Sequence, residues 1–337
     1  MSSGEWHALG HLAVNIDLSW DEGQQAIFDS LTLFVEDRYA EVAARESGGV
    51  LDKELWRELG ALGVLAVGTE AGDGGPGEAV AAAEALGHGA VPGPLAETFF
   101  ATQVLPDPER RAVAAGECIV SVGVAPWLPW ADAADFFVLR EETARGAGRA
   151  WLAKPAGEVE YLESLGGETW GSAEWVRGAE LENSSEGHLM GELVHAAYLA
   201  AAGSRLVHDA AEYAGTREQF GRPIGSFQAV SHPLVDCHLR LVSAATLARA
   251  AAAKLASGDV VGSQTWAAAA RLSANGASLD AVHVCHQVFG AIGITTEGPI
   301  FHVTRRIRQM ASGVPGVPAA RARLLEHFGL EEVPDEY

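Results

Sequence analysis

The sequence is poor in cysteine and in positive charge. Its three cysteines, Cys118, Cys237 and Cys285, are odd in number and far apart in the chain. A disulfide framework is therefore disfavoured, and a reducing cytoplasm is the expected compartment. The 23 basic residues are outnumbered by 45 acidic ones, which gives a formal net charge of −22. Phosphate backbones and anionic membrane surfaces repel such a chain, and this argues against a general nucleic-acid-binding protein.

Two kinds of apolar segment are also absent from the sequence. No apolar run reaches the roughly 20 residues that span a bilayer. The N-terminus has no basic region followed by an apolar core, as a secretion signal would. What is present is 48% hydrophobic and 20% charged residues over 337 positions, which is typical of a folded chain with a large core and not of a disordered acidic protein. We expect a cytoplasmic protein without membrane insertion.

Composition divides the chain into three parts. Residues 1–115 predict helices at about 22–46, 51–62, 77–87 and 92–104, the first of them opened by a capping box that begins at Ser19. Residues 116–187 contain short β-rich runs between glycine-containing turns. Residues 188–337 are rich in alanine and predict helices at about 189–216, 226–256, 259–288, 299–311 and 317–328. The predicted fold is mostly α: a helical domain, a small β insert and an antiparallel four-helix bundle.

Two motifs point weakly to other classes of protein. The run Gly72–Gly77 matches G-x-G-x-x-G, but it follows a helical pattern and not a strand, so an inter-helix loop is favoured over a dinucleotide site. His283, Cys285 and His286, with Cys237 on the preceding helix, suggest a metal cluster. Cys285 is turned away from His283 on a helix, so packing between helices is the preferred interpretation.

The informative segment is 213–232, YAGTREQFGRPIGSFQAVSH. It predicts the end of one helix, a tight Gly/Pro corner and the start of the next helix. An arginine at such a corner suits bidentate contact with a pyrophosphate. The alternative interpretation of this segment is a helix hairpin whose charges are solvated.

A second segment, 286–300, HQVFGAIGITTEGPI, gives the first its context. Together the two resemble the acyl-CoA dehydrogenase family, which shows R-x-Q-F-G-x-P-I-x-x-F-Q-x-V-x-H and, some seventy residues later, Q-x-x-G-G-x-G-x-T-x-E-x-P. The helical run 54–63, ELWRELGALG, and the glycine-rich loop agree. The resemblance covers most of 20–328 and is most specific in the bundle.

The resemblance implies FAD-dependent desaturation of an acyl-CoA thioester between Cα and Cβ. In this family a glutamate takes the α-proton, the flavin accepts the β-hydride, and the ADP end of the FAD reaches the partner subunit. The residues at the matching positions are implied to contact that ADP end in trans: Arg217, Gln219, Phe220 and Ile224 at the corner, and Gln287, Gly290 and Ala291 in the second segment.

Other parts of the family's site are missing from the sequence. The usual base position falls at about Val314, and neither Glu nor the following Thr is present. An alternative base position on the first bundle helix falls one residue from Glu192, without the Arg-Pro that accompanies it. The β insert lacks the T-E-x-x-x-G-S-D run and the W-I-T strand that hold the flavin ring, and it is short for the family's β domain.

Three hypotheses follow from this pattern. The first is a β-type subunit without a base, which completes the FAD site of a longer partner in an α2β2 assembly and resembles subunits from actinobacterial steroid side-chain breakdown. The second is a self-sufficient flavoenzyme with Glu192 as the base. The third is a family relic that acts as a scaffold. A steroid CoA ester is the preferred substrate.

Overall fold

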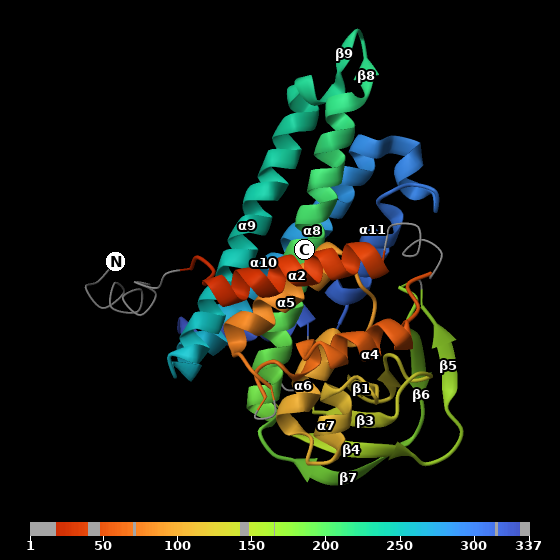
Figure 1. Cartoon of the computed structure of the whole chain (residues 1–337), viewed down its shortest axis with the longest axis vertical. Helices are drawn as coiled ribbons and strands as arrows, with labels where there is room; N and C mark the ends of the chain where they lie inside the picture. The colour runs from red at the N-terminus through yellow and green to blue at the C-terminus, as the bar shows by residue number, and fades with distance from the viewer. Residues whose placement is uncertain are drawn as a thin grey trace, which may run out of the picture.

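The computed structural model describes residues 18–39, 48–69, 72–141, 148–164, 166–313 and 316–330. Figure 1 shows a β-rich part at one end of the molecule, long bundle helices that reach the other end, and shorter N-terminal helices against their flank. Across the described ranges, no helix is both long and apolar enough to span a bilayer.

The N-terminal part is helical, as predicted. Its elements are α2 (Glu22–Arg38), α4 (Lys53–Ala61), η1 (Val64–Ala66), α5 (Pro76–His88), α6 (Leu95–Val104) and α7 (Glu109–Ala114). The capping box of α2 begins at Asp21 and not at Ser19. The Asp21 carboxylate accepts from the Gln24 backbone N–H, and the Gln24 side-chain oxygen accepts from the Asp21 backbone N–H. The predicted extension of this helix to residue 46 lies outside the described residues, and the short helix α7 was not predicted.

The β part contains seven strands among the described residues. They are β1 (Val120–Gly123), β2 (Trp127–Leu128), β3 (Phe136–Arg140), β4 (Ala150–Pro155), β5 (Glu160–Glu163), β6 (Thr169–Ser172) and β7 (Trp175–Leu181). One sheet has the order β1-β3-β4-β7, in which only the β1–β3 pair is parallel, and a second, antiparallel sheet has the order β2-β6-β5. Buried aliphatic residues of β1 and β3 pack against α6, which positions this part against the N-terminal helices.

The C-terminal part is the predicted bundle. Its elements are α8 (Ser184–Thr216), β8 (Glu218–Gln219), β9 (Arg222–Pro223), η2 (Ile224–Ser226), α9 (Gln228–Ala256), α10 (Val260–Phe289), η3 (Gly290–Ile294), α11 (Phe301–Ala311) and α12 (Gly316–His327). Helix α9 buries an apolar stripe that contains Leu234, Cys237 and Leu241. Buried alanines on α8, α9 and α10 allow the three helices to lie close together over their length.

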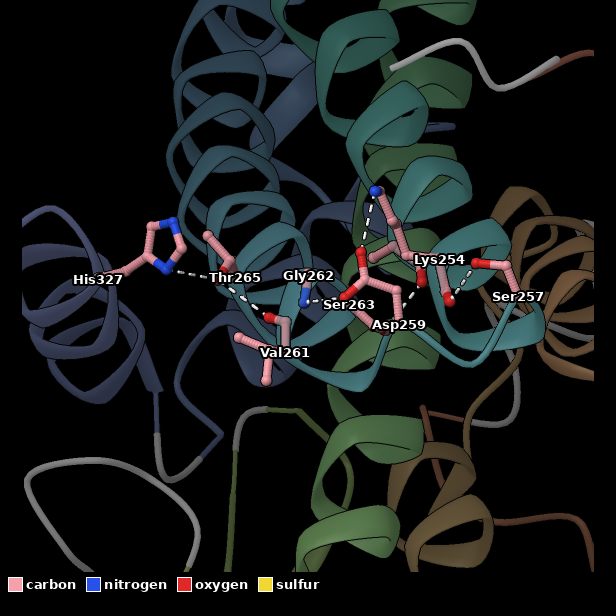
Figure 2. Close-up of polar contacts among 9 residues, drawn as sticks. Lys254, Ser257, Asp259, Val261, Gly262, Ser263, Thr265 and His327 are labelled. Carbon is pink, nitrogen blue, oxygen red and sulfur yellow. Dashed lines mark hydrogen bonds and ion pairs between the residues drawn. The ribbon is translucent and has the colours of Figure 1, made fainter. Parts of the chain in front are cut away.

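The turn between α9 and α10 is held by polar contacts (Figure 2). The Asp259 carboxylate accepts from the Gly262 backbone N–H at 2.9 Å and from Lys254 Nζ at 2.9 Å, so one side chain caps α10 and ties it to α9. One turn later, Thr265 Oγ1 lies 3.2 Å from His327 Nδ1. The last turn of α12 is thereby attached to the start of α10.

Helix α8 lies at the centre of the molecule, because it packs against the N-terminal helices α5 and α6 as well as against α9 and α10. The Tyr198 hydroxyl on α8 donates to the Val91 carbonyl at 2.8 Å and accepts from Arg306 Nε on α11 at 3.1 Å. Arg306 also donates to the Gly93 carbonyl at 2.7 Å. These buried bonds join the segment before α6, α8 and α11, so the side chains that α8 presents to its neighbours are held in place.

Candidate functional site

The corner between α8 and α9 is a β-hairpin with a two-residue turn. Strands β8 and β9 pair Glu218 with Pro223 and Gln219 with Arg222. The turn residues Phe220 and Gly221 both have positive φ, +54° and +78°, as type I′ turns require. A phenylalanine in this region costs about 1–2 kcal/mol, so the backbone here is strained. Figure 1 shows the hairpin standing beyond the ends of the two helices.

The hairpin presents an aromatic ring to solvent. Phe220 is 94% exposed, the highest value among the exposed large hydrophobic residues. Its ring lies edge-on to Phe227, with the centroids 6.2 Å apart, and the Arg222 guanidinium covers the Phe227 ring at 4.1 Å. Burial within this chain does not explain an exposed ring on a strained turn. The arrangement suits stacking on a flat partner group.

Arg217 and Gln219 extend from the same hairpin. The Arg217 side chain is exposed, and within the described part of the chain no carboxylate lies within ion-pairing distance of it. Gln219 is also exposed, and its Nε2 donates to the Glu218 carbonyl at 2.7 Å. Ile224 differs from both, because it is partly buried on the core while its N–H donates to the Arg217 carbonyl at 2.8 Å. The structure therefore leaves the arginine free and uses the isoleucine to seat the hairpin.

The second predicted patch lies at the end of α10. Gln287, Gly290 and Ala291 are exposed. Gly290 has φ +61° and ψ −137°, a conformation that glycine alone adopts readily, and it ends the helix there. The rings of Tyr213 on α8 and Phe289 on α10 stack at 4.5 Å and so bring the two patches to the same end of the bundle. Their role in binding remains a prediction.

Glu192 lies inside the molecule, at the junction of the three parts. It is 3% exposed, and Arg323 of α12 donates to its Oε2. His188, one turn earlier on α8, places its Nε2 3.8 Å from the Glu192 Oε1. Burial alone would raise the pKa of Glu192, but the Arg323 and Arg271 guanidinium groups outweigh it and hold that pKa below its usual range. The carboxylate is therefore ionised and paired.

His188 is a neutral histidine with a defined tautomer. Its Nδ1 accepts from the Arg140 guanidinium of β3, so the ring proton is on Nε2. Burial, together with Arg140, Arg323 and Arg271, lowers the pKa of His188 to about 3.

The charged neighbours of Glu192 were missed by sequence reasoning. Arg140, Arg271 and Arg323 come from β3, α10 and α12, so no local pattern joins them to Glu192. The one available signal was the i, i+4 spacing of His188 and Glu192, which places both on one face of α8.

The space beside Glu192 is small. A cavity of about 40 Å³ is lined by residues from α6, β1, β3, α8, α10 and the segment after α11: Ala96, Glu97, Phe100, Val122, Arg140, His188, Gly191, Glu192, His195, Arg271 and Gly313. A volume of this size holds a few water molecules, not a flavin ring or an acyl chain. Val314, the predicted family base position, lies outside the described residues.

The residues of the suggested metal cluster do not share one environment. Cys237 and Cys285 are buried core residues, whereas His283 is exposed. Burial raises the pKa of both thiols, which keeps them protonated. The Gly72–Gly77 loop follows helical turns and opens α5, so it has no strand before it.

Comparison with known proteins identifies the family. The N-terminal and C-terminal domain models of acyl-CoA dehydrogenase match residues 21–105 and 186–313. Acyl-CoA dehydrogenase IpdE2 of Mycolicibacterium smegmatis is 29% identical over 296 residues, which are 84% of this chain and 90% of that protein. Acyl-CoA dehydrogenase FadE34 of Mycobacterium tuberculosis is 30% identical over 313 residues, 81% of this chain and 42% of that protein. The chain belongs to the acyl-CoA dehydrogenase family of oxidoreductases.

Solved structures confirm the predicted fold class. A chain of the ChsE4–ChsE5 complex from Mycobacterium tuberculosis superposes with a TM-score of 0.79 at 23% identity, over 94% of this chain and all of that one. A chain of the steroid ACAD Tcur3481–Tcur3483 superposes at 0.77 and 22% identity, over 91% of this chain and 98% of that one. The FAD complex of PigA gives 0.74 at 20% identity, over 94% of this chain and 100% of that one.

The neutral, buried state of His188 predicts a pH-dependent stability. The unfolded histidine has a pKa near 6.5, above the folded value, so the unfolded chain binds the extra proton first as pH falls. Stability is therefore lost progressively from about pH 6.5 towards pH 3. His188→Gln should make this loss shallower by up to about 1.4 kcal/mol per pH unit, measured by urea unfolding at pH 7, 6 and 5. Exposed His232→Gln is the control, and an equal slope in wild type and His188→Gln would contradict the assignment.

Proposed function

We propose that this chain is the base-lacking subunit of a heteromeric, FAD-dependent acyl-CoA dehydrogenase and that it completes the partner subunit's FAD site in trans. FAD would supply the hydride acceptor for α,β-desaturation of an acyl-CoA thioester. The observation that carries the proposal is the contrast between an exposed corner, whose arginine has no carboxylate partner among the described residues, and a narrow inner cavity. The two features lie at opposite ends of α8: the corner follows its C-terminal end, and the cavity lies near its start.

The corner has the chemistry that the ADP end of FAD requires. Arg217 offers a planar, permanently charged fork for the pyrophosphate, and Phe220 offers a flat apolar face for the adenine. Gln219, Gln287 and the backbone near Gly290 and Ala291 supply further polar groups at the same end of the bundle. These groups lie at the opposite end of α8 from the inner cavity of their own chain, which supports binding to a partner's cofactor.

The inner cavity argues against catalysis by this chain alone. A general base must reach the α-proton within about 3 Å and be free to accept it. Glu192 is instead engaged by Arg323, and the space beside it is about 40 Å³. This favours the subunit hypothesis over the one in which Glu192 is the base.

The similar proteins suggest the partner and substrate. The ChsE4–ChsE5 neighbour is a complex, and the Tcur3481–Tcur3483 neighbour is named a steroid ACAD. We therefore infer an α2β2 assembly with a longer acyl-CoA dehydrogenase subunit that carries the catalytic Glu, acting on a steroid side-chain CoA ester. The scarcity of cysteine supports a cytoplasmic location.

Arg217→Ala tests the corner. If the guanidinium binds the pyrophosphate, a charge-assisted contact of about 1.5–3 kcal/mol is lost, so FAD affinity of the assembly should fall roughly ten-fold or more. Arg240→Ala is the control, because Arg240 is an exposed arginine of α9 paired with Asp280. FAD retention is measured by flavin absorbance after gel filtration. Unchanged retention in an intact assembly would show that the corner is only structural.

Glu192→Gln separates the subunit from the self-sufficient enzyme. We expect acyl-CoA turnover by the assembly to stay within a few-fold of wild type, because Glu192 is not the base. Loss of a general base would instead lower the rate by about 10²–10⁴-fold. Since breaking a buried ion pair is destabilising, the double variant Glu192→Gln with Arg323→Gln is measured beside it. A collapse of turnover in both, with folding and FAD content preserved, would contradict the proposal.

A further inference from the structure

The lining of the inner cavity carries polar atoms that have no partner. They belong to four residues, each at most 6% exposed: Nε2 of His188, Oε1 of Glu192, Nε2 of His195 and Nε of Arg271. Buried donors and acceptors are almost always hydrogen-bonded, in part by buried ligands and water. His188 Nε2 and Glu192 Oε1 lie 3.8 Å apart, too far for a hydrogen bond, so all four atoms around this space indicate a constituent that is held there.

The charges around the cavity are also unbalanced. Two guanidinium groups line it, Arg140 and Arg271, and among the described residues neither has a carboxylate within 4 Å. Arg140 meets the His188 ring and the face of Phe100, and Arg271 donates to the Gly313 carbonyl at 2.8 Å. Two carboxylates line the cavity as well: Glu192 is engaged by the third guanidinium, Arg323, and burial raises the pKa of Glu97, which favours its uncharged form. Buried guanidinium groups are ordinarily neutralised by an anion.

We propose that the inner cavity is a binding site for one small inorganic anion of the size of chloride or bromide. Arg271 Nε–H donates to the anion, and the guanidinium charges of Arg140 and Arg271 balance it. This site goes beyond the function proposed above, and it stands whether or not the chain completes a partner's FAD.

The size and the remaining atoms of the cavity agree with this ligand. About 10–15 Å³ holds one water, so 40 Å³ has room for an anion and about two waters. The waters donate to the two acceptors, Glu192 Oε1 and the free nitrogen of His195. Larger oxyanions do not fit, and a cation would face two unpaired guanidinium groups. The anion connects β3, α8 and α10, where the β part meets the bundle.

Bromide is the probe that tests the site directly. The protein, in the assembly in which it is isolated, is crystallised in sodium bromide, and diffraction is measured at the bromine absorption edge. We expect an anomalous peak inside the cavity, in contact with Arg271. Density there without an anomalous signal, while bromide is seen elsewhere on the molecule, would mean that water alone fills the cavity and would overturn the proposal.

Solution stability gives an independent readout. At fixed ionic strength, the unfolding midpoint should rise as gluconate is replaced by bromide, since only the small anion enters the cavity. Arg271→Gln and Arg140→Gln should each abolish this rise, and the exposed-site control Arg240→Gln should keep it. If the first two variants fail to fold, the wild-type anomalous map decides. Equal midpoints of the wild-type protein in the two salts would contradict the proposal.

Discussion

The ion pair between Glu192 and Arg323 determines what the inside of this protein can do. It joins the central helix α8 to the last helix α12 and engages the one carboxylate near the alternative family base position. A buried carboxylate that lost its cation would be strongly destabilising, so the pair cannot open at low cost to accept a proton from a substrate. The neutral His188 and the Arg140 guanidinium extend this arrangement from α8 to the β part. Together these contacts close the space beside Glu192.

The outer corner differs from the buried ion pair, because its side chains are exposed. Phe220 is exposed on a strained turn, and Arg217 is exposed with no carboxylate close to it within the described ranges. Neither arrangement is required by the fold of a single chain. Local strain persists where the surroundings fix it, and it is common at binding sites. The protein therefore presents a cation and an apolar ring on its outside and holds Glu192 in a buried ion pair, which is the distribution expected of a subunit that serves another chain's site.

Much of the fold could be predicted from the sequence because its signals are local. Apolar periodicity predicts most helix ranges to within a few residues. The capping residue of α2 was assigned to Ser19 instead of Asp21, since both precede the helix and either could accept a backbone N–H. Helix α7 was missed because six residues show no clear period. The hairpin corner was located from its family motif.

The inner cluster could not be predicted because its members are distant in sequence. Arg323 lies 131 residues from Glu192, and Arg140 lies 48 residues from His188. Their meeting depends on how the β part and α12 pack on α8, which no periodicity encodes. For the same reason the family motif predicts a missing base at about Val314, but it does not predict the charged side chains beside α8.

The flavin content of the chain purified by itself tests the central claim most directly. The chain is expressed alone and together with its longer partner, and FAD is measured per protein by absorbance after gel filtration. The account predicts a colourless lone chain and a yellow assembly, because the chain contributes an outer contact and the space beside Glu192 is too small for a flavin ring. Stoichiometric FAD in the lone, folded chain would contradict it.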